Sequence, residues 1–403
     1  MSSAGLRRTA PPPSPEELIQ RARGLVPEIR ARAEETEKNR RISREIIAKI
    51  REAELLRTTR PKEFGGFEYD AVIALEIALT ISAACASTGW CVNGALSNGI
   101  SFGHYPIETQ RELWGDDSDP FTCACFAPTG TALPTPDGYI LNGKWSFASG
   151  VDHSSWIRLG AFIKSTDGEA ADSAFFLLPI ADVEIEDNWF VYGLCGTGSK
   201  DIIVSDVFVP AHRVLFFADT RAGRTAGPRH HNNPLYRLPL LVLGASMLAS
   251  TAIGAAKGAL ADYLEMTSPR TTRGALAGGG FRMAEFPTVQ LRYAEASAAA
   301  EAAELILMTN VRNAMAKLRE GHAITVADHI RVRRDQAYAT KLALQAVEAL
   351  NASTGGAGLQ LSNPIQRAWR DVNAVARHVG LNWDAVGTMY GQHAFGLEPR
   401  GQY

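Results

Sequence analysis

The sequence predicts an α+β protein in which a helical domain, a β domain and a second helical domain follow one another along the chain. Apolar residues recur at helical spacing from Glu16, short β-rich runs fill residues 121–210, and long alanine-rich helical patterns occupy the remainder. With 403 residues and 46% hydrophobic content, the chain can bury a large core and divide into two or three domains.

The first helical domain is expected over residues 16–118, after a disordered tail over residues 1–15. The tail holds two arginines and three successive prolines without an apolar run, so it is unlike a secretory signal. Within the domain, helical spacing is clearest at Leu18, Ala22, Leu25, Ile29, Ile47, Ile50 and Leu55.

The β domain is expected over residues 119–228 and the second helical domain over residues 229–403. Gly, Asp and Pro separate the β-rich runs, which is typical of strands joined by turns. The segment Leu238–Ala256 carries no charge over 19 residues, close to the length of a transmembrane helix. Its many small residues, and the lack of a second such segment, favour a helix buried in a bundle, so no membrane span is expected.

Charge and cysteine content narrow the function classes. The 41 basic and 43 acidic side chains nearly cancel, and long runs of like charge are missing, which argues against a nucleic-acid surface. The five cysteines are odd in number and lie in apolar surroundings, as expected for free thiols in a reducing, cytoplasmic compartment. Cys123 and Cys125 are separated by one residue on an expected strand, which is poor zinc geometry, so no metal site is expected.

A set of short motifs makes the prediction more specific, because their order and spacing are hard to produce by chance. They are Ala86–Trp90, Leu141–Gly150 with Asp152, His153 and Trp156, Gly193–Ser199, Asp206–Pro210, Pro364–Asp371 with His378, and His393–Leu397. With these motifs the chain resembles the acyl-CoA dehydrogenase superfamily from about Glu16 to Leu397. Within it, the chain is similar to the two-component flavin monooxygenases that hydroxylate steroid-derived phenols and 4-hydroxyphenylacetate.

The resemblance implies an acyl-CoA dehydrogenase-like fold with a central β-barrel domain and a C-terminal four-helix bundle. It implies an oxygenase component that takes reduced flavin, FADH2 or FMNH2, from a separate NAD(P)H:flavin reductase. With O2 the flavin would form a C4a-hydroperoxyflavin and hydroxylate a small aromatic or heteroaromatic molecule of phenolic or indole type. The family is typically homotetrameric. A second nucleotide-binding domain is not recognisable in the sequence, which agrees with a separate reductase.

Position 379 separates the two main branches of this superfamily. In the dehydrogenases a catalytic glutamate commonly follows the aspartate equivalent to Asp371 by eight residues, and here that position is Val379. A valine cannot remove a proton, whereas the neighbouring His378 can take or give one. A histidine here is the mark of the monooxygenases, and we expect it on the same helical face as Asp371. Arg370 and Asp371 are expected to form a structural pair.

The resemblance also assigns residues to the flavin ring and to the substrate. Ser149 is implied to face flavin N5 and Trp145 to pack near the isoalloxazine. Asn98 replaces a histidine that holds the phenolic oxygen in related hydroxylases, and an amide cannot act as a base near neutral pH. Either the substrate lacks an acidic phenol or His378 alone handles it. The substrate pocket is expected to be lined by Asn98, Phe102, Phe126, His378 and His393.

Weaker cofactor ligands are expected at three places. The Gly193–Ser199 loop does not match a dinucleotide fingerprint, but its Thr197 and Ser199 are candidate flavin ligands. Gly355 and Gly356 resemble a turn that lets the backbone approach the FAD pyrophosphate. Arg270 is placed like an arginine that reaches a flavin phosphate across a subunit boundary.

Three alternatives stay open at this point. An acyl-CoA dehydrogenase or oxidase is disfavoured by Val379 and by the lack of any acidic residue between Thr220 and Ala261. Oxygenation at nitrogen or sulfur is kept open by Asn98. A noncatalytic scaffold is disfavoured because Ser149 and His378 are both present.

Overall fold

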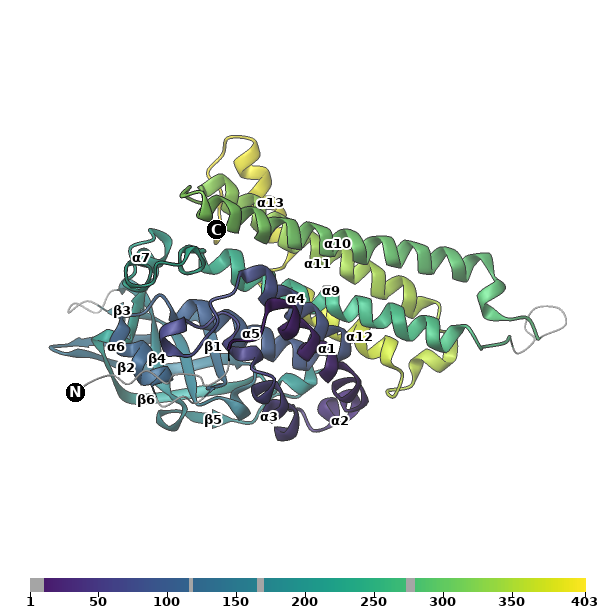
Figure 1. Ribbon diagram of the computed structural model, residues 1–403, viewed down its shortest axis with the longest axis horizontal. Coiled ribbons are helices and arrows are strands. Elements are labelled where there is room, and N and C mark those ends of the chain that lie inside the picture. Colours follow the sequence, from purple (N-terminus) through teal and green to yellow (C-terminus); the bar gives the residue numbers. More distant parts are fainter. Residues whose placement is uncertain (1–10, 116–118, 165–169, 273–279) are drawn as a thin grey trace.

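The computed structural model describes residues 11–115, 119–164, 170–272 and 280–403 (Figure 1). Most of the predicted tail, residues 1–10, lies outside these ranges. The first helix begins at Pro15, where the Ser14 side chain accepts the Glu17 N–H and the Glu17 carboxylate accepts the Ser14 N–H. This capping box satisfies two backbone donors that a helix start leaves unpaired.

Six helices form the N-terminal region before the sheet begins. Most residues of α4 and α5 are buried, which explains why their apolar residues show little one-sided periodicity. The helices are α1 (Pro15–Ala31), α2 (Ala33–Lys38), α3 (Arg44–Glu52), α4 (Ala71–Ala84), α5 (Ala86–Phe102) and α6 (Ile107–Trp114).

The central region is a seven-stranded sheet in the order β5-β6-β2-β1-β3-β4-β7. Neighbouring strands are antiparallel except β1 and β3, which run parallel. In the described residues β5 and β7 stand at the two ends of this order, and the predicted central β domain is confirmed. The strands are β1 (Thr122–Thr135), β2 (Gly138–Ala148), β3 (Trp156–Lys164), β4 (Ala170–Pro179), β5 (Glu184–Glu186), β6 (Lys200–Pro210) and β7 (Val214–Phe216).

The C-terminal region is built on four long helices, α9 to α12, with α13 packed on α11. In Figure 1 these helices extend to the right, away from the strands. α9 is long and apolar enough to cross a membrane, but 72% of its most apolar window is buried, as predicted for a bundle helix. The helices are α7 (Phe217–Arg221), α8 (Gly227–His230), α9 (Leu240–Thr267), α10 (Pro287–Arg319), α11 (Val326–Ala352), α12 (Pro364–Ala376) and α13 (Trp383–Ala394).

The junction between α5 and the sheet positions the site. Gly150 follows β2 with φ +77°, a left-handed conformation that favours glycine. A Cβ there would lie 3.0 Å from the Phe121 ring and 3.4 Å from Cys91 on α5. The chain therefore turns sharply after β2 and holds Ser149 beside α5.

Candidate active site

Ser149 is the centre of a hydrogen-bonded chain that joins α5 to the loop before β6. The Trp90 indole Nε1–H donates to Ser149 Oγ at 2.9 Å. Ser149 Oγ lies 2.7 Å from Ser199 Oγ, which lies 2.6 Å from Thr197 Oγ1. Thr197 Oγ1 in turn donates to the Leu194 carbonyl at 2.8 Å. Of the predicted flavin-site residues, the structure thus brings Ser149, Ser199 and Thr197 into direct contact.

The direction of each hydrogen bond in this chain is set by Thr197, the last hydroxyl. A hydroxyl has one proton, and Thr197 gives its proton to the Leu194 carbonyl. Ser199 must then donate to Thr197, and Ser149 must donate to Ser199. Trp90 already donates to one lone pair of Ser149 Oγ, so the only hydrogen-bonding position left on this oxygen is its second lone pair. Ser149 can therefore accept a hydrogen bond from a bound group but cannot donate one.

His378 lies beside this chain, although not where the helical spacing predicted. α12 ends at Ala376, so His378 is in the following turn and not on the helix face of Asp371, which corrects that prediction. Its ring centre is 5.7 Å from that of Trp90, in an edge-on arrangement. Burial, with a smaller effect from the Arg333 charge, lowers the pKa of His378 to about 4.

The tautomer of His378 follows from the one hydrogen bond that its imidazole ring forms with the described residues. The Gly380 N–H donates to Nδ1 at 3.1 Å, so Nδ1 is the unprotonated nitrogen of a neutral imidazole. The proton is consequently on Nε2. At neutral pH this side chain presents an N–H donor, and the low pKa makes it a weak base.

Arg370 and Asp371 are structural, but the predicted pair between them is wrong. Arg370 binds the Glu37 carboxylate at 2.6 Å and the Tyr192 carbonyl at 2.7 Å. Asp371 accepts the Leu194 N–H at 2.6 Å, and burial raises its pKa to about 6. α12 therefore holds the loop that ends the hydroxyl chain.

Asn98 is buried two helical turns beyond Trp90. Its Nδ2 donates to Thr122 Oγ1 at 3.1 Å, and its Oδ1 accepts from Arg158 Nη2 at 3.3 Å. The Arg158 guanidinium carbon is 5.7 Å from the Phe102 ring centre and 4.9 Å from that of Phe126. Three predicted pocket residues thus surround one arginine that the sequence reasoning did not select. The signal was present: an arginine in the apolar run Trp156–Leu159.

Trp145 does not join the Ser149 chain. Its side chain is 1% exposed in the core of the sheet, where Nε1 donates to the Gly160 carbonyl at 2.6 Å. This placement argues against the prediction that Trp145 packs on the flavin ring. The accessible aromatic residue of the same segment is Phe147, which is 61% exposed and whose ring centre is 5.4 Å from that of Trp189. An exposed aromatic surface beside Ser149 fits a planar flavin ring.

Arg270 and Gly355 lie close together within the same chain. Arg270 comes just after the end of α9, and Gly355 comes just after the end of α11. Arg270 Nη1 donates to the Thr354 carbonyl at 2.7 Å, and Nη2 is 3.5 Å from where a Gly355 Cβ would be. Gly355 has φ +66°, and Gly356 has open space where its Cβ would stand. A guanidinium beside an open glycine turn is chemically suited to a phosphate.

His393 and Val379 lie outside the Ser149 chain. His393 is half-buried on α13, which packs on α11, and no described contact joins it to the other predicted pocket residues. Val379 is 78% exposed. The structure therefore does not gather His393 into the site, and its pocket role stays a prediction.

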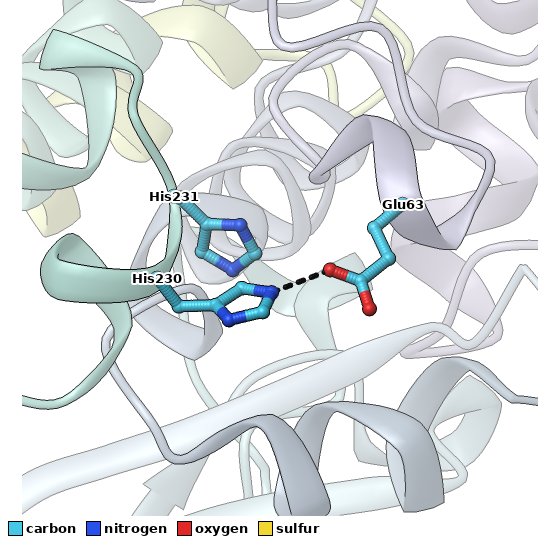
Figure 2. Close-up of side chains that lie close together, drawn as sticks. All are labelled: Glu63, His230 and His231. Atoms are coloured by element: carbon cyan, nitrogen blue, oxygen red, sulfur yellow. Dashed lines mark hydrogen bonds and ion pairs between the residues drawn. The ribbon is translucent and has the colours of Figure 1, made fainter.

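A second cluster holds the segment around α8 in place. Figure 2 shows His230 and His231 side by side facing Glu63, with their ligand atoms within 4.8 Å of one another. His230 Nε2 is 2.6 Å from the Glu63 carboxylate, and His231 Nε2 is 2.8 Å from Gln110 Oε1. A metal ion would have to displace these bonds. The cluster instead holds residues 227–231 against α6 and the Glu63 turn.

Comparison with known proteins agrees with this fold. Residues 13–115 match the acyl-CoA dehydrogenase N-terminal domain, and residues 246–383 match the acyl-CoA dehydrogenase C-terminal domain. The chain therefore has the acyl-CoA dehydrogenase fold, as the motifs predicted.

Particular relatives narrow the class further. The chain is 45% identical over 391 residues to the oxygenase component of the FADH(2)-dependent resorcinol hydroxylase of Rhizobium sp. (strain MTP-10005), covering 96% of each chain. It is 34% identical to the flavin-dependent monooxygenase oxygenase subunit HsaA of Rhodococcus jostii, covering 94% of this chain and 98% of the relative.

The crystal structure of 3-HSA hydroxylase from Rhodococcus sp. RHA1 matches with a TM-score of 0.90 and 34% identity, over 94% of this chain and 97% of the other. XiaF from Streptomyces sp., in complex with FADH2 and glycerol, matches with a TM-score of 0.87 and 29% identity, over 96% and 97%. The chain belongs to the oxygenase components of two-component flavin-dependent monooxygenases, whose co-substrates are reduced flavin and O2.

Proposed function

We propose that this protein hydroxylates a small phenol, with reduced flavin delivered by a separate NAD(P)H:flavin reductase. The names of its relatives support an aromatic substrate: besides the resorcinol hydroxylase, the chain is 27% identical to a p-hydroxyphenylacetate 3-hydroxylase and 27% identical to an indole-3-acetate monooxygenase. When bound, the reduced flavin supplies the oxygen activation. The chain supplies binding, orientation and protection from water.

The single observation that carries the proposal is that Ser149 Oγ can accept a hydrogen bond from a bound group but cannot donate one. Reduced flavin carries a proton on N5, and a lone pair is the partner such an N–H requires. Trp90, Ser199 and Thr197 then act as positioning residues, because they hold the hydroxyl of Ser149 in one orientation. A hydroxyl free to rotate could donate toward N5 and remove this preference.

His378 is assigned as a hydrogen-bond donor. A neutral imidazole with its proton on Nε2 can donate to an oxygen atom of the reacting group, while its pKa of about 4 makes it a poor acceptor for a phenolic proton. Of the two roles that the sequence allowed, base or stabiliser of oxygen, the geometry supports the second. Phe102 and Phe126 are proposed to line the substrate space.

The Arg270–Gly355–Gly356 cluster is proposed to hold a flavin phosphate. Its position after the C-terminal ends of α9 and α11, on other elements than Ser149, supports a phosphate whose ring is bound by a neighbouring subunit, hence a homotetramer of the type found in the family. An FAD would use this site and an FMN would not. The four buried free thiols, whose pKa values burial raises, support a reducing cytoplasmic location.

Turnover with isotopically labelled O2 tests the proposal. The protein, a flavin reductase, NADH and either FAD or FMN would be incubated with resorcinol, 4-hydroxyphenylacetate or indole. We expect a phenol product that carries one labelled oxygen atom, and little hydrogen peroxide. Ser149→Ala should keep flavin binding and convert most of the consumed O2 into peroxide. Labelled product from indole alone would contradict the phenol assignment.

A further inference from the structure

Arg158 is a fully buried cation without a matching anion in the described chain. Its side chain is 0% exposed on β3, and it forms no ion pair with a described carboxylate. Nη2 donates to Asn98 Oδ1 at 3.3 Å, while Nε and Nη1 have no hydrogen-bond partner in the part of the chain that the structure describes. Burial of a charge is costly unless it is paired and its donors are satisfied. These two unpartnered nitrogens, which carry three N–H groups, therefore indicate a partner that binds from outside the chain.

Two further unpaired polar groups lie in the field of this charge. Tyr105 is 0% exposed and His104 is 5% exposed, and neither Tyr105 Oη nor His104 Nε2 has a hydrogen-bond partner among the described residues. His104 is anchored from its other side, where Nδ1 lies 2.9 Å from Thr225 Oγ1. Burial and the Arg158 charge keep His104 neutral by lowering its pKa to about 4. Arg158, Tyr105 and His104 form a buried polar cluster, which we call the arginine cluster.

Aromatic rings enclose the guanidinium on several sides. Its central carbon lies 5.7, 4.9 and 4.7 Å from the ring centres of Phe102, Phe126 and Phe175. Phe126 is 47% exposed, so it is the outer wall of this enclosure, whereas Phe102 and Phe175 are buried. A planar aromatic molecule that displaced the Phe126 ring could reach Arg158 and keep the cation against π faces.

We propose that Arg158, with Tyr105, binds the phenolate oxygen of a ring hydroxyl on the end of the substrate that points away from the flavin. This inference rests on the proposed phenol hydroxylation and names its selectivity: phenols with an acidic hydroxyl remote from the attacked carbon. Asn98 lies eight residues after Trp90, about 12 Å along the axis of α5, so one aromatic molecule can lie between the arginine cluster and the Trp90–His378 pair. The phenolic proton is released to solvent on binding.

The assignment explains how the site works with an amide at position 98. Asn98 cannot remove a proton, but it fixes one nitrogen of Arg158 and leaves the other two nitrogens free. A fixed guanidinium fork favours an oxygen anion without any base. Asn98 is therefore a positioning residue for Arg158.

Equilibrium dialysis under anaerobic conditions, with the protein saturated with reduced flavin, tests this. The probes are resorcinol, its dimethyl ether and benzoate. Arg158→Met should weaken resorcinol binding about ten- to a hundred-fold, the value of a charged hydrogen-bonded pair, and leave the ether unchanged. Arg213→Met is the matched control, because Arg213 stacks on Trp156 at 5.1 Å but already pairs with Glu112. It should leave all three affinities unchanged.

Folding and flavin affinity are measured on the same variants. Since Arg158 has no internal anion, Arg158→Met should be at least as thermostable as the wild type, which a purely structural arginine would not allow. If that variant does not fold, Tyr105→Phe decides, because it removes only an unpaired hydroxyl. It should weaken resorcinol binding about five-fold.

Three results would overturn the inference. They are equal resorcinol affinity in the wild type and the folded variant, an equal loss for resorcinol and the ether, and Arg158-dependent binding that prefers benzoate. Failure of the proposed function looks different: the wild type would then hydroxylate none of the phenols. Equal hydroxylation by the wild type and Arg158→Met would remove only the role of Arg158.

Discussion

Substitution of Asp371 by asparagine should make protein stability less sensitive to pH. Asp371 is buried on α12 against the loop that carries the hydroxyl chain, and its pKa is raised from 3.8 to about 6, mainly by burial. Asparagine keeps an oxygen that can accept the Leu194 N–H, now at 2.6 Å from the carboxylate, but has no charge to bury. The substitution therefore isolates the cost of ionising this carboxyl group.

The magnitude follows from the two pKa values. Below pH 3.8 the group is protonated in both states and imposes no cost. As pH rises from 3.8 to about 6, Asp371 loses its proton in the unfolded chain but keeps it in the folded chain. The free energy of unfolding of the wild type therefore falls over this range and is fully reduced above it. A shift of about two pKa units corresponds to about 3 kcal/mol. Asp371→Asn should thus gain about 3 kcal/mol relative to the wild type between pH 4 and pH 8.

Equilibrium urea unfolding at a series of pH values measures this difference. The slope on urea concentration should be unchanged, so that the midpoint reports stability. His378, with its lowered pKa, titrates in both proteins and cancels in the comparison. Asp328→Asn is a control of opposite sign, because hydrogen bonds from Lys317 and Thr325 lower the pKa of Asp328 to about 2. A difference between Asp371→Asn and wild type that stays constant with pH would refute the reasoning.

Three further predictions concern the site and its frame. Ser199→Ala removes two hydrogen bonds of 2.6 and 2.7 Å, should cost about 1–3 kcal/mol in urea unfolding, and should raise peroxide release because Ser149 can then rotate. His378→Gln should form more hydroxylated product per NADH than His378→Ala, because glutamine keeps an N–H donor; equal product from the two variants would contradict the donor role. In the wild type, product per NADH should show no titration of His378 from pH 6 to 8, since the pKa of His378 in the folded protein is about 4. Gly227→Ala should destabilise strongly, as its Cβ would lie 1.6 Å from the Gly103 carbonyl, whereas Gly244→Ala in open space on α9 should be neutral or stabilising by up to about 1 kcal/mol.

Local sequence patterns predicted the elements well, because periodicity and turn residues report on a chain's own neighbours. The alanine-rich helical patterns predicted for the last part of the chain are found as long helices, among them α10 and α11, and most of the uncharged segment lies in the mostly buried helix α9. The order of the strands in the sheet was not predictable, because it depends on pairing between strands that are distant in the sequence. The end of α12 was missed by two residues, and this changes which face His378 occupies.

The site residues also divide into those that the sequence could predict and those that only the structure reveals. Ser149, Thr197 and Ser199 were selected by motif, and the structure joins them through hydrogen bonds. Trp145 and Phe147 are two residues apart, so a regular strand would place them on the same face. The register shift between Trp145 and Ala148, which the sequence does not reveal, buries Trp145 and leaves Phe147 exposed. Arg158 was missed because a lone arginine in a strand has meaning only when its unpaired donors can be seen. Those contacts are tertiary and lie beyond any spacing argument.

Rapid mixing of the anaerobic protein and reduced flavin with O2 tests the central claim most directly. The account holds that the acceptor-only hydroxyl of Ser149 and the neutral His378 protect oxygenated flavin from collapse. We predict a long-lived near-ultraviolet absorbance of a flavin–oxygen adduct in the wild type, and its accelerated decay in Ser149→Ala. Immediate reoxidation of the flavin by the wild type, without an adduct, would contradict the account.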